Sequence, residues 1–283
     1  MPQKTKSCPK VSVLMPAYNS EKYIGEAIES ILNQTFTDFE FIIINDGSTD
    51  NTAKIVRKYA KKDKRIKFVD NKKNKGVTKT RNELLKLAKG EYIACMDSDD
   101  ISLPTRFEKQ IKYMNEHPEC GVLGTWYEVF DKQNYISRFA SKITILKLLH
   151  GCAVCNPSAM IRKSVIDRNN LEYNNNFNWC EDYEFWSRMI FFTEIHTLQS
   201  VLLKYRWHNT NISVEHAKKQ DELANIVKQN IVNRLTDDKD QQRLLLSSLK
   251  PGFLLPKWSG RIICLFIPKR QIRHNFREKY VKD

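Results

Sequence analysis

Short apolar runs alternate with amphipathic stretches along the first third of the chain. The apolar runs have the length of strands and lie at residues 11–15, 39–44, 66–69 and 91–96. Apolar side chains at helical spacing between these runs predict helices at residues 24–32, 52–59 and 77–89. Pro16 is expected to end the first strand, and Gly90 the third helix. Strands that alternate with helices form right-handed βαβ units, so the pattern predicts an α/β fold with a mostly parallel central sheet flanked by helices.

The rest of the chain is less regular. Helices are expected at residues 104–117, 143–150 and 181–191, and strands at residues 121–130, 159–161 and 201–207. After about residue 213 the pattern turns helical and polar, and it is basic from Lys250 onward. We therefore expect a main domain over residues 1–213 and a helical, basic C-terminal extension over residues 214–283.

Polar residues follow three of the predicted strands, at the point where each strand ends. Tyr18-Asn19 follow the first strand, and Asp46-Gly47 follow the second. Residues 97–100 follow the fourth. Because ligands of open α/β sheets bind beyond the carboxyl ends of the strands, we expect these three groups to belong to one site.

Asp97-Ser98-Asp99-Asp100 places three carboxylates within four residues. An isolated acidic run of this kind is more often a solvated turn. At a strand end beside other polar groups, the repulsion between the carboxylates indicates that a cation lies among them. Hard oxygen ligands suit Mn²⁺ or Mg²⁺, which complete their coordination with water and substrate phosphates. The cluster therefore predicts a divalent metal and a phosphate-bearing substrate.

Composition restricts the class of partner. The chain has 283 residues, 41% of them hydrophobic, and a net charge of +14. This charge favours an anionic partner such as nucleic acid, an acidic membrane surface or a nucleotide-linked substrate. Seven scattered cysteines and a polar, basic start without an apolar signal segment predict a cytoplasmic protein with reduced thiols.

Two other functions are alternatives to an enzyme that acts on a nucleotide-linked substrate. A basic nucleic-acid-binding protein fits the charge, but the basic residues do not interleave with aromatic ones as in RNA-binding signatures, and the central motifs are acidic. A sugar nucleotidyltransferase usually carries a Gly-rich, basic phosphate loop near its N-terminus, and residues 11–19 contain none. We therefore expect no nucleic-acid partner.

Seven motifs follow one another in an order that resembles the family 2 glycosyltransferases, which have the GT-A nucleotide-sugar-binding fold. The motifs lie at residues 11–19, 44–50, 74–82, 97–100, 156–158, 181–186 and 205–208. The resemblance covers about residues 10–213. It implies a GT-A catalytic domain over residues 1–213, with a donor half at about 10–100 and an acceptor half at about 101–213.

The resemblance also implies which residues bind the nucleotide-sugar. Tyr18 is expected to stack on the base, and Asp46 to accept the N3–H of uracil, so the implied donor is a UDP-sugar. Arg81 is expected near the diphosphate or the acidic cluster, and Asp97 near the ribose or a metal-bound water. Ordinary turn, cap and surface roles are the alternatives for such residues. The whole set implied at the nucleotide-sugar comprises Pro16, Ala17, Tyr18, Asn19, Asp46, Gly76, Arg81, Asp97 and Ser98.

The metal ligands and the catalytic base are implied in the same way. Asp99 is the expected ligand of Mn²⁺ or Mg²⁺, and His208 is either a further metal or diphosphate ligand or a structural histidine. Asp100 is expected to contact the sugar or to cap the next helix. Asp182 resembles the catalytic base and follows Glu181 at the start of a predicted helix, whose N-terminus favours an ionised carboxylate. A plain helix cap is the alternative for Asp182.

These implied roles describe a metal-dependent inverting glycosyltransferase. Asp182 would take a proton from an acceptor hydroxyl, whose oxygen would attack the anomeric carbon opposite the departing UDP. The implied acceptor is a glycan or a lipid-linked saccharide in bacterial surface polysaccharide or lipopolysaccharide assembly. Residues 250–283 mix basic, aromatic and aliphatic side chains. They are expected either to bind an anionic membrane, at the cytoplasmic face of the inner membrane, or to pack on the catalytic domain.

Overall fold

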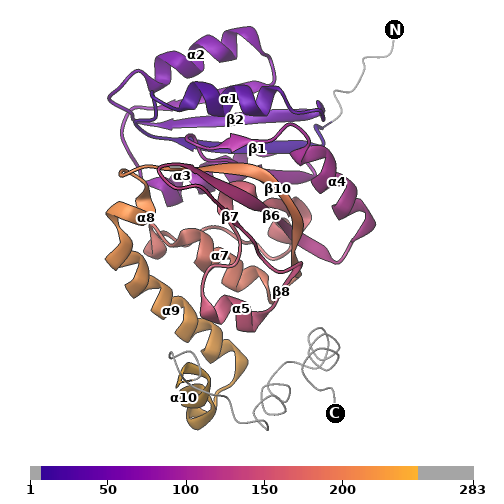
Figure 1. The fold of residues 1–283 in the computed structure, drawn as a ribbon, viewed down its shortest axis with the longest axis vertical. Helices are drawn as coiled ribbons and strands as arrows, with labels where there is room; N and C mark the ends of the chain where they lie inside the picture. Colours follow the sequence, from indigo (N-terminus) through magenta and orange to yellow (C-terminus); the bar gives the residue numbers. More distant parts are fainter. Residues whose placement is uncertain (1–7, 248–283) are drawn as a thin grey trace.

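The computed structural model describes residues 8–247, and within them one ten-stranded mixed sheet with helices on both faces (Figure 1). The first part of the chain follows the predicted alternation of strand and helix. Its elements are β1 (Val11–Ala17), α1 (Ile24–Leu32), β2 (Phe39–Asp46), α2 (Thr52–Lys62), β3 (Ile66–Asn71), α3 (Val77–Leu87) and β4 (Tyr92–Cys95). The four strands and three helices predicted there are confirmed.

The second part combines short strands with two long ones. Its elements are β5 (Ile101–Ser102), α4 (Arg106–Glu116), β6 (Cys120–Asp131), β7 (Tyr135–Ser137), β8 (Lys142–Ile143), α5 (Ile145–His150), β9 (Met160–Arg162), α6 (Lys163–Arg168), α7 (Glu181–Met189) and β10 (Glu194–Trp207). Three helices follow, namely α8 (Ile212–Glu215), α9 (Ala217–Leu235) and α10 (Lys239–Ser247).

The strand order places the ends of the main strands along one edge. The order is β3-β2-β1-β4-β9-β6-β10-β5, with β7 paired to β6 and β8 to β10. β1, β2, β3 and β4 are parallel to one another, and β6 is parallel to β10. β9 runs antiparallel to both β4 and β6, so the two parallel groups point the same way. The carboxyl ends of β1, β2, β4, β6 and β10 therefore share one edge of the sheet.

Alternate residues of the central strands supply two hydrophobic cores, one on each face of the sheet. In β2, Phe41 and Ile43 pack with α1, α2 and α4, whereas Ile42 and Ile44 pack with α3, α5, α7 and α9. Figure 1 shows α1 and α2 above the sheet and α5 and α7 below it. All four β2 side chains are fully buried, and each such burial stabilises the fold by about 1.5–3 kcal/mol.

Two expectations about element ends are wrong. Pro16 does not end β1 but lies inside it, because β4 pairs only with Val11–Leu14 and leaves β2 as the partner at Pro16. α3 ends at Leu87, so Gly90 is not its stop. Gly90 instead allows a close approach to β1, because a Cβ there would lie 2.5 Å from the backbone N of Ser12.

The region around β10 departs most from the sequence pattern. β10 begins at Glu194 rather than at residue 201, because its polar first half pairs with β6 through several register shifts. The helix predicted at residues 143–150 is divided between β8 and α5. Thr144 separates them, since its hydroxyl accepts the N–H of Lys147 and caps α5.

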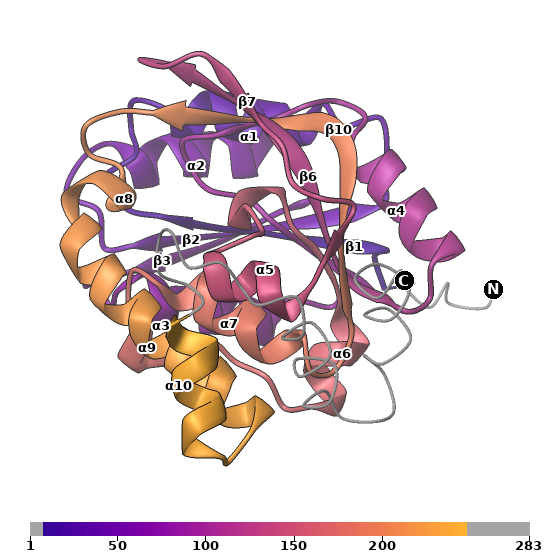
Figure 2. The same cartoon turned by 60° about the horizontal axis from the view of Figure 1, so that its bottom comes forward.

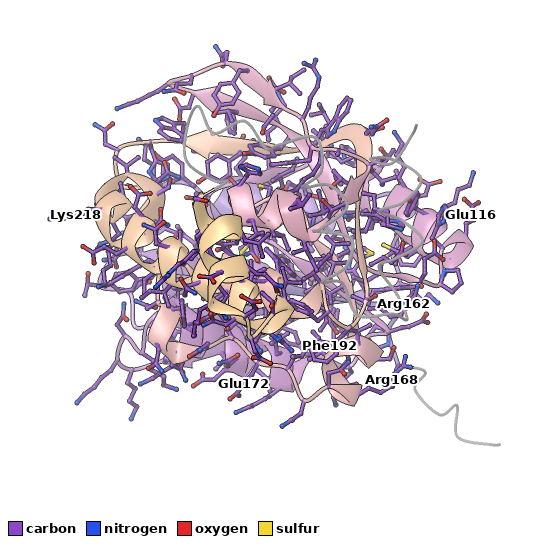
Figure 3. The ribbon with its side chains drawn as sticks, turned by 90° about the horizontal axis from the view of Figure 1, so that it is seen from below. Glu116, Arg162, Arg168, Glu172, Phe192 and Lys218 are labelled. Atoms are coloured by element: carbon purple, nitrogen blue, oxygen red, sulfur yellow. The ribbon has the colours of Figure 1, made fainter. Side chains whose placement is uncertain are left out.

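The described part of the C-terminal extension, residues 214–247, is helical as predicted and packs on the main domain. Leu223, Val227 and Ile231 of α9 are buried in the same core as the apolar face of α7. Figures 2 and 3 show α9 and α10 on the side of the sheet that carries α7, with Lys218 at the start of α9 pointing outward. None of the described helices has the length and apolar character needed to cross a membrane. The basic segment at residues 250–283, with its expected membrane contact, lies outside the described residues.

Candidate active site

Hydrogen bonds tie together the loops that follow β1 and β2. Asn19 adopts a left-handed conformation with φ of +47°, and its side-chain oxygen accepts a 2.9 Å hydrogen bond from the Thr49 N–H. The Asn19 N–H donates to the Ser48 hydroxyl, also at 2.9 Å. The neighbouring Tyr18 side chain remains 49% exposed at this edge of the sheet. Asn19 thus fixes the loop, while the Tyr18 ring is free to meet a ligand.

Asp46, the last residue of β2, organises the loop that leads into α3. Its buried carboxylate accepts hydrogen bonds from the N–H groups of Lys75, at 3.0 Å, and Gly76, at 2.9 Å. The loops approach so closely that a Cβ on Gly47, whose φ is +72°, would lie 2.6 Å from the backbone N of Asn74. The Asp46 carboxylate therefore shapes this loop, and its contact with a base stays a prediction.

The remaining residues expected at the nucleotide lie in or beside the same edge. Pro16 and Ala17 are the last residues of β1, and the Ala17 side chain is buried. The Ser98 hydroxyl is buried and lies 2.7 Å from the Ser20 hydroxyl. Ser98 thereby joins the loop of residues 97–100 after β4, called the acidic loop below, to the loop after β1.

Arg81 of α3 joins the acidic loop to the start of α7. Its Nη2 donates to Asp97 at 2.9 Å, and its Nε donates to Glu181 at 3.1 Å. With its amide oxygen turned toward Arg81, Asn156 accepts a further bond of 2.9 Å from Nη1. Burial would lower the pKa of the Arg81 guanidinium, but the charges of Asp97 and Glu181 outweigh it and raise that pKa. Arg81 is therefore a fixed positive charge between two acidic groups that are far apart in the sequence.

Asp182 lies in the first turn of α7, beside Glu181, as predicted. Burial, and next the charge of Glu181, raise the pKa of the Asp182 carboxyl to about 7. A hydrogen bond from the Tyr183 N–H and the charge of Arg81 act in the opposite direction but are weaker. The helix N-terminus favours an ionised carboxylate at Asp182, but desolvation outweighs this effect. A carboxyl with this pKa accepts a proton readily near neutral pH.

Asp99 and His208 face each other where the acidic loop meets the end of β10. The Asp99 Oδ2 lies 3.0 Å from the Nε2 of His208. The His208 ring stacks on Tyr23 at a centroid distance of 5.0 Å, and its Nδ1 lies 2.9 Å from the Thr210 hydroxyl. These contacts orient the ring so that Nε2 points to the carboxylate. A carboxylate oxygen and an oriented imidazole nitrogen are suitable ligands for Mn²⁺, with substrate oxygens completing the shell.

Asp100 differs in role from its neighbours. Its carboxylate is buried, and its Oδ1 accepts the Arg206 N–H at 2.9 Å. Burial, and next the charges of Asp99 and Asp97, raise the pKa of Asp100 well above its usual value. β5 follows it directly, so the expectation that Asp100 caps the next helix is wrong. Asp100 instead fixes the acidic loop to β10.

Sequence reasoning assigned no role to Asn156 or Arg206, although both lie in motifs that it singled out. The Arg206 Nε donates to the Asp99 carbonyl at 2.9 Å, and its guanidinium also pairs with Glu26. The same guanidinium lies between the rings of Tyr23 and Phe130. The motifs that contain Asn156 and Arg206 were the signal in the sequence that these residues matter. Only the fold shows which groups they contact.

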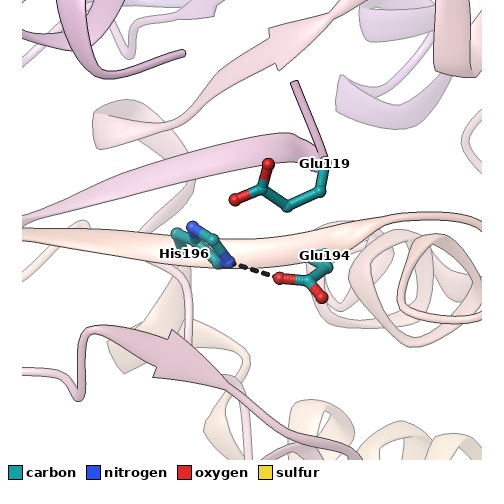
Figure 4. A group of neighbouring side chains, drawn as sticks. All are labelled: Glu119, Glu194 and His196. Atoms are coloured by element: carbon teal, nitrogen blue, oxygen red, sulfur yellow. Dashed lines mark hydrogen bonds and ion pairs between the residues drawn. The ribbon is translucent and has the colours of Figure 1, made fainter. Parts of the chain in front are cut away.

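A second cluster of titratable groups lies away from this edge, where β6 and β10 begin. It comprises Glu119, Glu194 and His196, whose ligand atoms all lie within 4.8 Å of one another (Figure 4). Glu194 pairs with His196 at 2.8 Å and with the Lys142 ammonium at 2.5 Å. Because Lys142 and His196 already pair with the Glu194 carboxylate, we interpret the cluster as a structural ion-pair network.

Comparison with known proteins agrees with the fold and the motifs. Residues 12–169 match the family described as Glycosyl transferase family 2. The chain is 32% identical over 207 residues to UDP-Glc:alpha-D-GlcNAc-diphosphoundecaprenol beta-1,3-glucosyltransferase WfgD of Escherichia coli, covering 72% of this chain and 79% of that one.

Two solved structures share the fold. TarS 1–349 of S. aureus in complex with UDP-GlcNAc superposes with a TM-score of 0.71 at 22% identity, over 96% of this chain and 88% of that one. Mannosyltransferase PcManGT from Pyrobaculum calidifontis, in complex with GDP-Man and Mn²⁺, gives a TM-score of 0.64 at 15% identity, over 93% and 73%. The family match at residues 12–169 covers more than half of the chain. It favours a transferase and argues against the alternative of a basic nucleic-acid-binding protein. The chain belongs to glycosyl transferase family 2, and it is a glycosyltransferase with the GT-A fold.

Proposed function

We propose that the protein is a metal-dependent inverting glycosyltransferase that moves a sugar from a UDP-sugar to a hydroxyl of a glycan or lipid-linked acceptor. The observation that carries this proposal is the Arg81 bridge between Asp97 and Glu181. It brings the acidic loop of the donor half next to Asp182, so a donor and a base can act on the same bond. The division into donor and acceptor halves is part of the proposal.

The donor side of the proposal rests on Tyr18 and Asp46. The exposed Tyr18 ring can stack on a base, and Asp46 lies at the end of the neighbouring strand. A carboxylate that accepts N3–H favours uracil over cytosine, which lacks that proton. The name of WfgD includes UDP-Glc and TarS was solved in complex with UDP-GlcNAc, and both support a uridine donor.

We propose that Asp99 and His208 hold the divalent metal, with Asp97 close to them in the acidic loop. When bound, Mn²⁺ or Mg²⁺ neutralises negative charge on the diphosphate as it leaves. The complex of PcManGT with Mn²⁺ supports this choice of metal. Asp100 and Arg206 keep the two ligands together by fixing the acidic loop to β10.

Asp182 serves as the general base. Its carboxylate takes the proton of the acceptor hydroxyl, the oxygen forms a bond to the anomeric carbon, and the bond from that carbon to the UDP oxygen breaks. Attack from the face opposite to UDP inverts the anomeric configuration. Catalysis then depends on the alignment of acceptor, sugar and base.

The acceptor and the setting are the least constrained parts of the proposal. WfgD is named for a diphosphoundecaprenol-linked acceptor, which supports a lipid-linked acceptor and surface-glycan assembly here. A lipid-linked acceptor makes membrane contact useful, and the basic, aromatic segment at residues 250–283 suits an anionic surface. We therefore propose that the protein works at the cytoplasmic face of the membrane.

The proposal is tested by a screen for UDP release from UDP-glucose, UDP-galactose and UDP-N-acetylglucosamine with Mn²⁺, using water as the acceptor. At least one donor is expected to release UDP, and Asp182→Asn is expected to slow that release by about 10²-fold while UDP still binds. A variant that keeps most of its turnover would show that Asp182 is not the base. Pyrophosphate release from UTP and a sugar phosphate would favour a nucleotidyltransferase.

A further inference from the structure

Trp179 has an unusual backbone conformation three residues before Asp182. Its φ is +73°, in the left-handed region that favours glycine. A bulky residue persists there only when its surroundings hold it. Such strain is concentrated at functional sites, which makes the contacts of Trp179 informative.

Two side chains of the C-terminal extension hold Trp179 in place. The His216 ring stacks on the indole at a centroid distance of 4.2 Å and an interplanar angle of 21°. The Gln220 amide donates a 2.6 Å hydrogen bond to the Trp179 carbonyl. His216 directly precedes α9 and Gln220 lies in its first turn, so one helix end makes both contacts.

The same helix is packed firmly on the helix that carries the base. Leu223 and Val227 of α9 are buried in one core with Phe185 and Trp186 of α7. Because the two helices share one close-packed core, the end of α9 that contacts Trp179 is held at a defined distance from α7.

The residues on either side of Trp179 are anchored to α3. Thr78 donates a 2.9 Å hydrogen bond to the side chain of Asn178, and Arg81 pairs with Glu181 at 3.1 Å. Thr78 and Arg81 are three residues apart and lie on one face of α3. The turn at Trp179 is thus held between α3 on the donor side and α9.

We propose that α9 is part of the catalytic machinery, because His216 and Gln220 hold Trp179 in its left-handed conformation and so set the position of Asp182. Trp179, His216 and Gln220 are positioning residues in this proposal. The proposal rests on the role of Asp182 as the base and gives the C-terminal extension a function beyond membrane contact.

The first test compares Trp179→Gly with Trp179→Ala, using UDP release from the active UDP-sugar with water as the acceptor. With water as the acceptor, no contact between Trp179 and a saccharide acceptor can contribute to the rate, so the assay reports the base alone. Glycine adopts a φ of +73° without strain and keeps the carbonyl bond, so its kcat is expected within about 3-fold of the wild type. Alanine is expected to lose about 10-fold or more, because a small misplacement of a catalytic group lowers the rate by up to about 10²-fold.

In both variants the KM for the UDP-sugar is expected to stay unchanged, because Tyr18 and Asp46 are untouched. A loss of folded protein would also lower the apparent kcat without changing KM. Melting curves of both variants detect such a loss. Equal kcat values for the glycine and alanine variants, whether high or low, would overturn the proposal.

The second test uses a matched pair of substitutions on α9. Gln220→Glu removes the donor to the Trp179 carbonyl, whereas Gln229→Glu makes the same change nine residues later, where the amide bonds to Asn233 on the helix surface. Gln220→Glu is expected to lower kcat by about 10-fold, and Gln229→Glu to leave it within about 2-fold. Equal kcat values for the two variants would count against the proposal.

The outcome for Asp182→Asn separates this inference from the proposed function. If Asp182→Asn is inactive and the Trp179 and Gln220 variants are fully active, only the inference about α9 fails. If Asp182→Asn keeps its turnover, the assignment of the base fails, whatever the α9 variants do.

Discussion

Asp99 and His208 are 109 residues apart in the sequence, yet their side chains meet at 3.0 Å between Oδ2 and Nε2. The contact exists because β4 and β10 end at the same edge of the sheet, with Arg206 bound to both Asp99 and Asp100. It joins the acidic loop after β4 to the end of the last strand. The proposed metal site therefore depends on the whole sheet.

The first prediction concerns this pair. UDP with Mn²⁺ is expected to raise the melting temperature more than UDP alone, since a ligand at about 100 times its Kd stabilises the native state by about 2.7 kcal/mol. Asp99→Asn and His208→Ala are expected to remove most of the metal-dependent part. His150→Ala, at the exposed end of α5, serves as the matched control. A full Mn²⁺ effect in both site variants would reject these ligands.

The second prediction concerns the pH dependence of the rate. Because the pKa of Asp182 is raised to about 7 and a base acts in its ionised form, UDP release is expected to rise with pH, to be half-maximal near that pKa and to level off roughly one pH unit above it. Glu181→Gln removes one cause of the raised pKa, so it is expected to move the midpoint to lower pH. Rates measured from pH 5 to 9 decide this. A midpoint that Glu181→Gln leaves unchanged or raises would contradict it.

The third prediction concerns stability. A carboxyl whose pKa is about 7 when folded and near 3.8 when unfolded binds more protons in the folded state between these values, so it makes stability fall as pH rises from about 4 to 7. Above pH 7 the loss is complete. Asp182→Asn is therefore expected to melt higher than the wild type at pH 8, by about 2–4 °C for each kcal/mol gained, with a smaller gain at pH 5. An equal or larger gain at pH 5 would contradict the raised pKa.

The fourth prediction concerns Asp46. Asp46→Asn replaces a carboxylate that accepts two backbone N–H groups, so it is expected to loosen the loop before α3 and to weaken UDP binding by about 10-fold or more. Asp38→Asn, at the other end of β2 and exposed, is the control. The wild type is expected to prefer UDP over CDP in a calorimetric titration. Equal affinity for both nucleotides would rule out the proposed contact with uracil.

The fifth prediction concerns the basic segment at residues 250–283. The full chain is expected to sediment with anionic liposomes at low salt and to be released at high salt, since each basic residue near the surface contributes about 1 kcal/mol. Truncation after Ser248 is expected to abolish sedimentation and to spare UDP binding. Neutral liposomes are the control. If the truncated chain sediments equally well, the segment has no membrane role.

The sequence predicted the elements of the first third of the chain well, because each of them is set by a local pattern. The strands of residues 11–96 are short apolar runs, and the helices between them carry apolar side chains at helical spacing. The polar groups at Tyr18, Asp46 and Asp97 follow the strand ends. The expectation that they share an edge required only the parallel order of βαβ units, and the strand order agrees with it.

Elements decided by distant partners were harder to predict. The first half of β10 is polar and forms a strand only because β6 pairs with it. Pro16 stays within β1 because its neighbour β4 is short, and Gly90 serves a close contact with β1 that no local pattern reveals. Sheet pairing and close approach are properties of the folded chain, so a single sequence carries little signal of them.

The sequence by itself determined the α/β class, the strand ends that carry polar groups, and the kinds of side chain available to bind metal and phosphate. Only the tertiary structure decided which charges meet. Arg81 pairs with Glu181 a hundred residues away, and burial together with the charge of Glu181 raises the pKa of Asp182 to about 7 against the weaker opposing effect of Arg81. The physical reason is that desolvation and Coulomb interactions depend on distances and burial in space, which spacing along the chain does not specify.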